Sequence, residues 1–464
     1  MRLTILGGGG FRVPFVHQAL LHGAAVAEVD EVVLHDTDPD RLDAIVHVLD
    51  QLADGAADPP RLRTTTSLDE AVRGADFVFT AIRVGGTAAR VHDERVALDL
   101  GVLGQETVGP GGVAFGLRTV PVMVAIAERI AELAPSAFVM NFTNPAGMIT
   151  EAMQTVLGGR VVGICDTPAD LGRRVAHAVG VDSAAVQLDY VGLNHLGWMR
   201  RVLHDGEDLL PALLADDARL ATLEEAQVFG SGWLRALGTL PNEYLYYYYR
   251  NREAVQRILA SPATRGEFLD GQQHELFAQI LAEPGRAAEL WAGALSARSA
   301  SYMAEARSAG PPPAAVDHRP PEPEPEPGGA PVGGADLAQH GYAGVALQVM
   351  GAIAHDRRSL MILNVRNGTT VAGLPPEAVI EVPTLVDAHG AHPLSTAPPD
   401  LHQLGLMQQV KSVEQATIRA ALTGSRADAR LAFGLHPLVH SFEVAEKLVD
   451  GYVAAVPEIA AVLR

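Results

Sequence analysis

Short apolar runs alternate with segments of helical periodicity along the N-terminal third of the chain. The apolar runs cover residues 3–6, 31–34, 77–82, 138–140 and 160–164. Helical patterns at residues 11–21 and 38–52 lie between them, and Pro39 fits the first turn of the second helix. Strands that alternate with helices in this way predict a doubly wound, mostly parallel sheet.

The pattern changes after Asp166, where longer helical stretches dominate. Strands are predicted at 186–191, 360–365 and 378–382, and helices at 212–236, 265–282, 408–422 and 442–455. We therefore expect an α/β protein with a Rossmann-like, NAD-binding domain at 1–165 and an α+β substrate and oligomerisation domain at 166–464. A Pro/Glu-rich insert at about 310–334 has almost nothing to bury and predicts an extended, disordered loop.

The chain has 464 residues and a formal net charge of -20, which limits the kinds of molecule that it can bind. Such a charge argues against binding to nucleic acid or to an anionic membrane surface, although a local arginine cluster still accommodates a small anion. The first apolar run is too short for a signal peptide, and no uninterrupted apolar stretch predicts a membrane span. The single cysteine, Cys165, excludes an intrachain disulfide. We expect a cytoplasmic protein.

The first predicted strand ends in a glycine-rich turn made of Gly7, Gly8, Gly9 and Gly10. Glycines let the backbone approach a pyrophosphate, and the N-terminus of the following helix favours its negative charge. Arg12 replaces the third glycine of the usual fingerprint, so a merely tight turn is the alternative. Asp36 ends the second strand, where an acid accepts hydrogen bonds from an adenosine ribose and favours NAD over NADP. Its alternative role is to cap the helix at 38–52.

Candidate ligand and substrate residues follow other predicted strands. Asn144 follows the strand at 138–140, where ligands bind in doubly wound folds, although Asn144-Pro145 is also an ordinary turn. Cys165 and His195 are potential metal ligands, but their spacing matches no recognised metal-binding motif. The alternative is that Cys165 is an ordinary buried cysteine and His195 a capped histidine. Arg83, Arg90, Arg95 and Arg265 are candidates for an anionic group, and Tyr244 and Tyr246–Tyr249 form a cluster in which packing is the usual role.

Taken in order, several segments resemble glycoside hydrolase family 4, whose members are NAD- and divalent-metal-dependent glycosidases. The segments are GGGGFRVP from Gly7, IRVGGTAAR from Ile82, GQETVGPGG from Gly104, NFTNPAG from Asn141, GICDTP from Gly163, GLNHLGW from Gly192, LPNEYLYYY from Leu240 and HPLVHS from His436. The resemblance runs nearly end to end and leaves only the proline-rich insert unmatched. It departs at Gly10, where the family usually has a serine.

The resemblance implies a role for each of these residues. Cys165 and His195 would hold Mn2+ or a similar ion beside the sugar, and Tyr244 would act as the base. Asn144, Asn194, Arg90 and Arg265 would contact the phosphorylated sugar. The turn at Gly7, Gly8, Gly9 and Gly10, with Phe11, Asp36 and Arg83, would bind NAD. The implied reaction is oxidation at C3, elimination across C2 and C1, addition of water and re-reduction, so that NAD is recycled.

The resemblance leaves the anomer open. Asp166 is the residue that the 6-phospho-α-glucosidases have at this position. The motifs along the rest of the chain resemble those of the 6-phospho-β-glucosidases more closely. We expect a homodimer or homotetramer that hydrolyses 6-phospho-β-glucosides, with Asp166 acting on water or on a sugar hydroxyl. A 6-phospho-α-glucosidase is the first alternative. A simple NAD-dependent 2-hydroxy-acid dehydrogenase and a non-catalytic dinucleotide sensor are the others.

Overall fold

Six parallel strands form the N-terminal part of the sheet in the computed structural model, which describes residues 1–23, 26–307 and 341–464. They are β1 (Arg2–Leu6), β2 (Glu31–His35), β3 (Arg61–Thr65), β4 (Phe77–Thr80), β5 (Phe138–Asn141) and β6 (Val161–Gly163). Their spatial order is β3-β2-β1-β4-β5-β6. This order is that of a dinucleotide-binding sheet, whose ligand crevice opens where the order reverses between β1 and β4. The predicted Rossmann-like sheet is confirmed.

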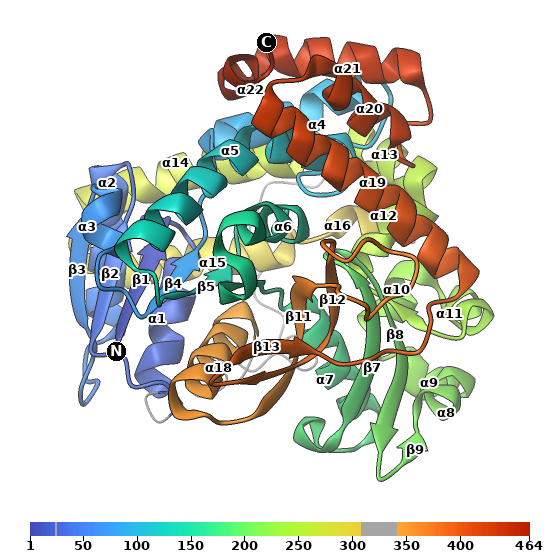
Figure 1. The fold of residues 1–464 in the computed structure, drawn as a ribbon, viewed down its shortest axis with the longest axis horizontal. Coiled ribbons are helices and arrows are strands. Elements are labelled where there is room, and N and C mark those ends of the chain that lie inside the picture. The colour runs from blue at the N-terminus through green and yellow to red at the C-terminus, as the bar shows by residue number, and fades with distance from the viewer. Residues whose placement is uncertain (24–25, 308–340) are drawn as a thin grey trace.

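The connecting helices cover this sheet (Figure 1). They are α1 (Val13–His22), α2 (Pro39–Leu52), α3 (Leu68–Val72), α4 (Gly86–Asp99), α5 (Pro110–Leu133) and α6 (Ala146–Leu157). Asp38, not Asp36, caps α2, since its carboxylate accepts hydrogen bonds from the amides of Asp40 and Arg41. Helix α5 is long and apolar enough to cross a membrane by composition alone, but 78% of its most apolar window is buried inside the protein. It is therefore a core helix of this fold.

Seven further strands continue the same sheet beyond β6. They are β7 (Gln187–Leu193), β8 (Leu196–His204), β9 (Glu207–Asp208), β10 (Leu240–Pro241), β11 (Ser359–Arg366), β12 (Val379–Asp387) and β13 (Gly390–Pro393). Strand β11 pairs antiparallel with β6 through Asn364 and Gly163, and β12 then joins β11 to β7. The boundary predicted between residues 165 and 166 thus lies within one continuous sheet of thirteen strands in the described part of the chain.

Helices surround this second part of the sheet, and the last four pack over α4 and α5 (Figure 1). They are α7 (Thr167–Val179), α8 (Leu210–Ala215), α9 (Asp217–Leu220), α10 (Glu224–Phe229), α11 (Ser231–Leu237), α12 (Tyr246–Tyr249), α13 (Asn251–Ala260), α14 (Arg265–Ala282), α15 (Ala287–Ala300), α16 (Ala304–Arg307), α18 (Gly341–His355), α19 (Leu401–Thr423), α20 (Arg426–Leu435), α21 (Phe442–Ala455) and α22 (Pro457–Val462). The helices predicted at 265–282 and 442–455 are confirmed at both ends.

The single helix predicted over 212–236 is wrong, because the chain there forms the four short helices α8 to α11. Asp216 and Leu223 adopt extended backbone, and Gly230 has a φ of 85°, so three breaks interrupt the helical pattern. Five strands lay outside the prediction, namely β3, β8, β9, β10 and β13. Strand β3 is an edge strand with mostly exposed residues, and β8 follows β7 after a turn of only two residues. The Pro/Glu-rich insert predicted at about 310–334 lies outside the described residues.

Candidate active site

A cavity of about 1830 Å³ opens at the carboxyl ends of β1, β4, β5 and β6. Helices α14 and α15 and the start of α18 form its other walls. Single-ligand pockets usually measure roughly 300–1,000 Å³. The cavity is therefore large enough for a dinucleotide and a sugar together.

The glycine turn forms one end of the cavity, and its four glycines serve different purposes. Gly7 and Gly10 line the cavity, and Gly7 has a φ of 90° with no room for a Cβ, which would lie 2.6 Å from the Ala81 carbonyl oxygen. Gly8 and Gly9 face away from it, because a Cβ on either would lie 2.7 Å from a side chain of β2 or α2. Only the first and last glycines are thus placed to touch a ligand.

Phe11 and Asp36 also line the cavity beside the turn. The Asp36 carboxylate accepts a hydrogen bond from the Gly9 amide at 3.0 Å, and a longer one from the Asp38 amide at 3.3 Å. The acid therefore joins the end of β2 to the glycine turn. This position at the end of β2 is the one from which an acid contacts an adenosine ribose.

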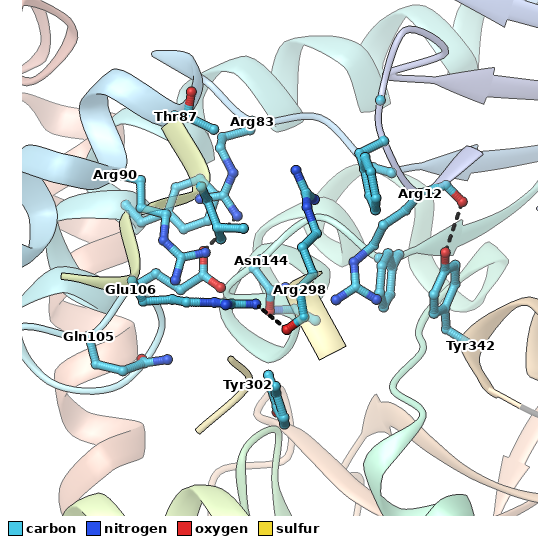
Figure 2. A pocket seen from close by; sticks show the side chains of 18 of the residues that line it. Arg12, Arg83, Thr87, Arg90, Gln105, Glu106, Asn144, Arg298, Tyr302 and Tyr342 are labelled. Carbon is cyan, nitrogen blue, oxygen red and sulfur yellow. Dashed lines mark hydrogen bonds and ion pairs between the residues drawn. The ribbon is translucent and has the colours of Figure 1, made fainter. Parts of the chain in front are cut away.

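Arg83, Arg90 and Glu106 form a charged cluster on the α4 side of the cavity (Figure 2). One Glu106 carboxylate oxygen accepts from Arg83 at 2.6 Å and lies 2.7 Å from Arg90. Burial opposes the ionised carboxylate, but Arg90 and Arg83 outweigh it and lower the pKa of Glu106 to about 2. Two arginines thus share one carboxylate. Arg95, in contrast, pairs with Glu267 and does not line the cavity.

Three further arginines, Arg12, Arg265 and Arg298, line the cavity and form no ion pair with another described residue. Figure 2 shows Arg12 and Arg298 among them. The Arg298 guanidinium lies 3.4 Å from the centroid of the Phe11 ring. Burial and the neighbouring Arg12 and Arg265 lower the pKa of Arg298 to about 9. Buried arginines that lack a carboxylate partner favour anionic ligands.

Arg12 and Arg265 are both held in place by neighbouring groups. The Arg12 guanidinium lies over the rings of Phe142 and Tyr342, and the Tyr342 hydroxyl donates to the Arg12 carbonyl at 2.8 Å. Arg265 is the first residue of α14, whose N-terminus is fixed by a capping box between Thr264 and Glu267.

Cys165 and His195 reach the cavity from the ends of β6 and β7. His195 has a φ of 61° in the turn between β7 and β8, and its Nδ1 shares a 3.0 Å hydrogen bond with Thr107. Burial lowers the pKa of His195 to about 4, so the imidazole is neutral at pH 7, and Nε2 is left free for a ligand. Burial and the nearby Glu381 raise the pKa of the Cys165 thiol.

The structure also places Asp166, Asn144 and Asn194 on the cavity wall. No group of three or more His, Cys, Asp or Glu side chains lies at metal-binding distance within the described residues. The pair Cys165 and His195 therefore suits a cation only where further ligands come from a bound molecule. Asp166 and Glu381 lie close enough to Cys165 to oppose its ionisation, and neither forms an ion pair with a described residue. This negative charge favours a cation beside the thiol.

Tyr244 lies directly on His195, with ring centroids 3.8 Å apart and an angle of 5° between the planes. The Tyr302 hydroxyl donates to the Tyr244 hydroxyl at 3.1 Å and reaches Glu243 at 3.4 Å. Burial and Glu243 raise the pKa of Tyr244, and burial raises that of Glu243 to about 8. Tyr244 therefore needs a nearby cation before its hydroxyl can act as a base near neutral pH.

Several residues that line or support the site were not predicted from the sequence. Arg298 and Tyr302 sit on or just after a helix with no motif, and Glu243 and Glu381 look like ordinary charged positions. Glu381 is buried and accepts hydrogen bonds from Asn364 at 2.9 Å and from Tyr190 at 3.1 Å. Burial raises the pKa of Glu381 to about 7. The one signal in the sequence that could have identified Glu381 is a lone charged residue inside an apolar strand.

Known proteins resemble the chain along nearly its whole length. The model of the family 4 glycosyl hydrolases matches residues 2–181, and that of their C-terminal domain matches residues 190–439. A probable 6-phospho-β-glucosidase of Bacillus subtilis is 30% identical, with 97% of this chain and 95% of that protein covered. A 6-phospho-β-glucosidase of Escherichia coli is 31% identical, with 98% and 95% covered.

A solved structure shares the fold. The 6-phospho-β-glucosidase of Thermotoga maritima, determined with manganese, NAD+ and glucose 6-phosphate, superimposes with a TM-score of 0.80 at 25% identity and with 99% of both chains covered. A 6-phospho-α-glucosidase of Leptotrichia buccalis is 27% identical over 100% of this chain and 99% of its own. Relatives of both anomeric specificities therefore match the chain end to end.

Proposed function

Because the chain belongs to family 4 of the glycosyl hydrolases, we propose that it hydrolyses 6-phospho-β-glucosides, such as cellobiose 6-phosphate, with NAD and a divalent metal. The relatives at 30% and 31% identity are a probable 6-phospho-β-glucosidase and a 6-phospho-β-glucosidase, which supports this substrate class. One observation supports the proposal most strongly. The stacked pair His195 and Tyr244 shares one cavity with Cys165, the glycine turn and several arginines.

The arginines supply the recognition of a phosphorylated sugar. We assign the sugar phosphate to Arg90 and Arg265, with Asn144 and Asn194 on the sugar hydroxyls. These residues come from four separate elements yet line the same cavity. Guanidinium groups bind phosphate strongly and directionally, which an apolar wall cannot do. The relative from Thermotoga maritima was determined with glucose 6-phosphate, which supports a phosphorylated substrate.

The cofactor and the metal have fitting residues in this chain. Gly7, Gly10, Phe11, Asp36 and Arg83 would hold NAD, with Gly8 and Gly9 shaping the turn. The pair Cys165 and His195 would hold the metal, and manganese and NAD+ are named for the Thermotoga maritima structure. When bound, NAD supplies reversible hydride transfer at the sugar ring and the metal supplies Lewis acidity beside the sugar hydroxyls.

The protein's own side chains move the protons. Tyr244 takes the proton from C2 of the sugar, and the hydrogen bond from Tyr302 stabilises the phenolate that the reaction needs. Stacking on His195 fixes the Tyr244 ring in one plane. Asp166, at the start of α7, acts on water or binds a sugar hydroxyl.

The anomer preference rests on two opposing signals. The two relatives at 30% and 31% identity are 6-phospho-β-glucosidases, whereas the relative from Leptotrichia buccalis, a 6-phospho-α-glucosidase, is 27% identical. Asp166 alone matches the α pattern that the resemblance implies. We weigh the whole chain above one residue, because a pocket wall depends on many positions.

The test is turnover of both anomers of nitrophenyl glucoside 6-phosphate with NAD+, Mn2+ and a reductant present. We expect the β anomer to be preferred, with no net accumulation of NADH. Product formed in D2O should carry deuterium at C2, since Tyr244 exchanges that proton with solvent. Retention of protium at C2 would exclude the elimination mechanism. A cytoplasmic location and a homodimer or homotetramer stay predictions for cell fractionation and light scattering.

A further inference from the structure

Glu381 is a buried carboxylate with only neutral hydrogen-bond donors. It lies on β12 with 1% of its surface exposed. Its oxygens accept from Asn364 Nδ2 at 2.9 Å, Tyr190 Oη at 3.1 Å and Asn194 Nδ2 at 3.4 Å. Glu381 forms no ion pair within the part of the chain that the structure describes. Burial disfavours the charged form of such a carboxylate unless a counter-charge lies close by, so a nearby cation would stabilise it.

The sheet places this carboxylate between the two strands that carry the proposed metal ligands. Glu381 pairs with Asn364 on β11, and Asn364 pairs with Gly163 on β6, two residues before Cys165. On its other side Glu381 pairs with Gly192 on β7, three residues before His195. Four neighbouring strands thus hold Glu381 at one level of the sheet, immediately behind both ligands.

Asn194 provides the direct link between Glu381 and the cavity. It precedes His195, lines the cavity, and donates its amide to Glu381. Gly163 leaves space for this arrangement, because a Cβ there would lie 2.8 Å from the Asn364 Cβ. The side-chain amide of Asn194 is therefore oriented from behind by a carboxylate, with its carbonyl oxygen left for other partners.

We propose that Glu381 is a positioning residue for the divalent metal: it orients Asn194 and supplies the negative charge that balances the cation held by Cys165 and His195. This inference rests on the proposed function, because it requires a metal at this pair. Charged groups directly behind metal ligands raise affinity by fixing the ligands and by compensating the ion's charge. The cation is in turn the counter-charge that the buried carboxylate otherwise lacks.

The experiment measures Mn2+ binding to the full-length protein by the loss of the free-Mn2+ electron paramagnetic resonance signal. Glu381→Gln keeps the shape and one oxygen that accepts from the two asparagine amides, and it removes the charge. Its amide nitrogen donates to the Tyr190 hydroxyl in place of the bond that the carboxylate accepts. We expect its Kd for Mn2+ to rise by about 10-fold to 100-fold. The Kd for NAD+ should stay the same in both proteins, which shows that the fold is intact. Thr384→Val, which alters a buried polar residue on the same strand, should keep the wild-type Mn2+ affinity.

The outcomes separate the inference from the function it rests on. Equal Mn2+ affinity in wild type and Glu381→Gln overturns the role of Glu381 and leaves the proposed function standing. A wild type that binds no Mn2+ overturns the metal part of the proposed function, and the inference with it. Should Glu381→Gln fail to bind NAD+, Glu381→Asp takes its place. Its shorter side chain should weaken Mn2+ binding several-fold, and wild-type affinity there would overturn the proposal.

Discussion

The imidazole of His195 and the phenol of Tyr244 lie face to face, 3.8 Å apart and within 5° of parallel. The two residues come from different parts of the chain, the turn between β7 and β8 and the segment after β10. The contact joins the proposed metal ligand to the proposed base. A movement of one ring would shift the other, so the proposed metal binding and the proposed proton abstraction would be structurally coupled.

Tyr244→Phe should keep this stacked pair but remove the reactive hydroxyl. We expect kcat to fall by about 10²-fold to 10⁴-fold, which is the usual contribution of a general base, while the Kd for Mn2+ stays constant. Steady-state kinetics and Mn2+ titration check both parts. Tyr246→Phe is the matched control, because Tyr246 bonds to Glu305 and does not line the cavity. Wild-type kcat in Tyr244→Phe would assign the base to another residue.

Removal of either proposed metal ligand should abolish tight metal binding. We expect Cys165→Ser and His195→Ala each to weaken Mn2+ binding more than about 100-fold, with NAD+ affinity unchanged. Thr107→Val removes the hydrogen bond to His195 Nδ1 and should cost about tenfold. Calorimetric titration distinguishes these cases. Tight Mn2+ binding by either ligand variant would place the metal elsewhere.

Arg298→Gln should weaken the binding of NAD+ in the absence of sugar. Arg298 lies on the Phe11 ring beside the glycine turn and has no carboxylate partner among described residues. A charge-assisted hydrogen bond contributes about 1.5–3 kcal/mol, so we expect the Kd for NAD+ to rise about 10-fold to 100-fold. Arg95→Gln, at the arginine that pairs with Glu267, is the control. If only glucose 6-phosphate binding weakens, Arg298 serves the sugar phosphate instead.

The pH dependence of stability should carry a contribution from Glu106. Its pKa falls from 4.5 in the unfolded chain to about 2 in the fold, because Arg90 and Arg83 outweigh burial. A lowered carboxyl pKa stabilises the fold above the unfolded value by about 3 kcal/mol, and this stabilisation disappears as pH falls from about 4.5 to 2. Glu106→Gln should therefore be less stable at pH 6. Urea unfolding should show the difference shrinking toward pH 3, and a constant difference would contradict it.

The alternation of predicted strands and helices was enough to predict the site residues that directly follow a strand. Cys165, Asn144 and Asp36 each end a strand of a doubly wound sheet, and such ends converge on one crevice, so their place in the cavity follows from the alternation of strands and helices. Tyr244 was singled out only through the family resemblance, because a tyrosine in a cluster of tyrosines usually packs.

The remaining residues depend on long-range pairing that no local pattern reveals. Glu381 reaches the site because β11 and β12 insert between β6 and β7, although β6 ends at Gly163 and β11 begins only at Ser359. Arg298 lies on α15, where a helical arginine resembles a surface residue until α14 and α15 close over the cavity. Strand β3 was missed for a related reason: as an edge strand it has little to bury and lacks an apolar run.

The last prediction concerns Asp166, the residue that opposes the rest of the chain on anomer preference. Its carboxylate lies at the cavity wall at the start of α7, one residue after Cys165. If Asp166 protonates the leaving oxygen, as the α pattern implies, the wild type should prefer the α anomer and lose that activity in Asp166→Asn. We expect the reverse. In the proposed stepwise elimination Tyr244 would first remove the proton at C2, so a good leaving group would depart without an acid on either face of the sugar.

Asp166→Asn should therefore retain most of its kcat/KM on nitrophenyl β-glucoside 6-phosphate. On cellobiose 6-phosphate, kcat should also stay within about tenfold of the wild-type value, short of the loss of about 10²-fold to 10⁴-fold that removal of a general acid would cause. Both anomers of the nitrophenyl substrate are measured for each protein at saturating Mn2+, because Asp166 adjoins a proposed metal ligand. A wild type that prefers the α anomer, with that preference abolished in Asp166→Asn, would show that Asp166 determines the anomer preference and that the rest of the pocket wall does not.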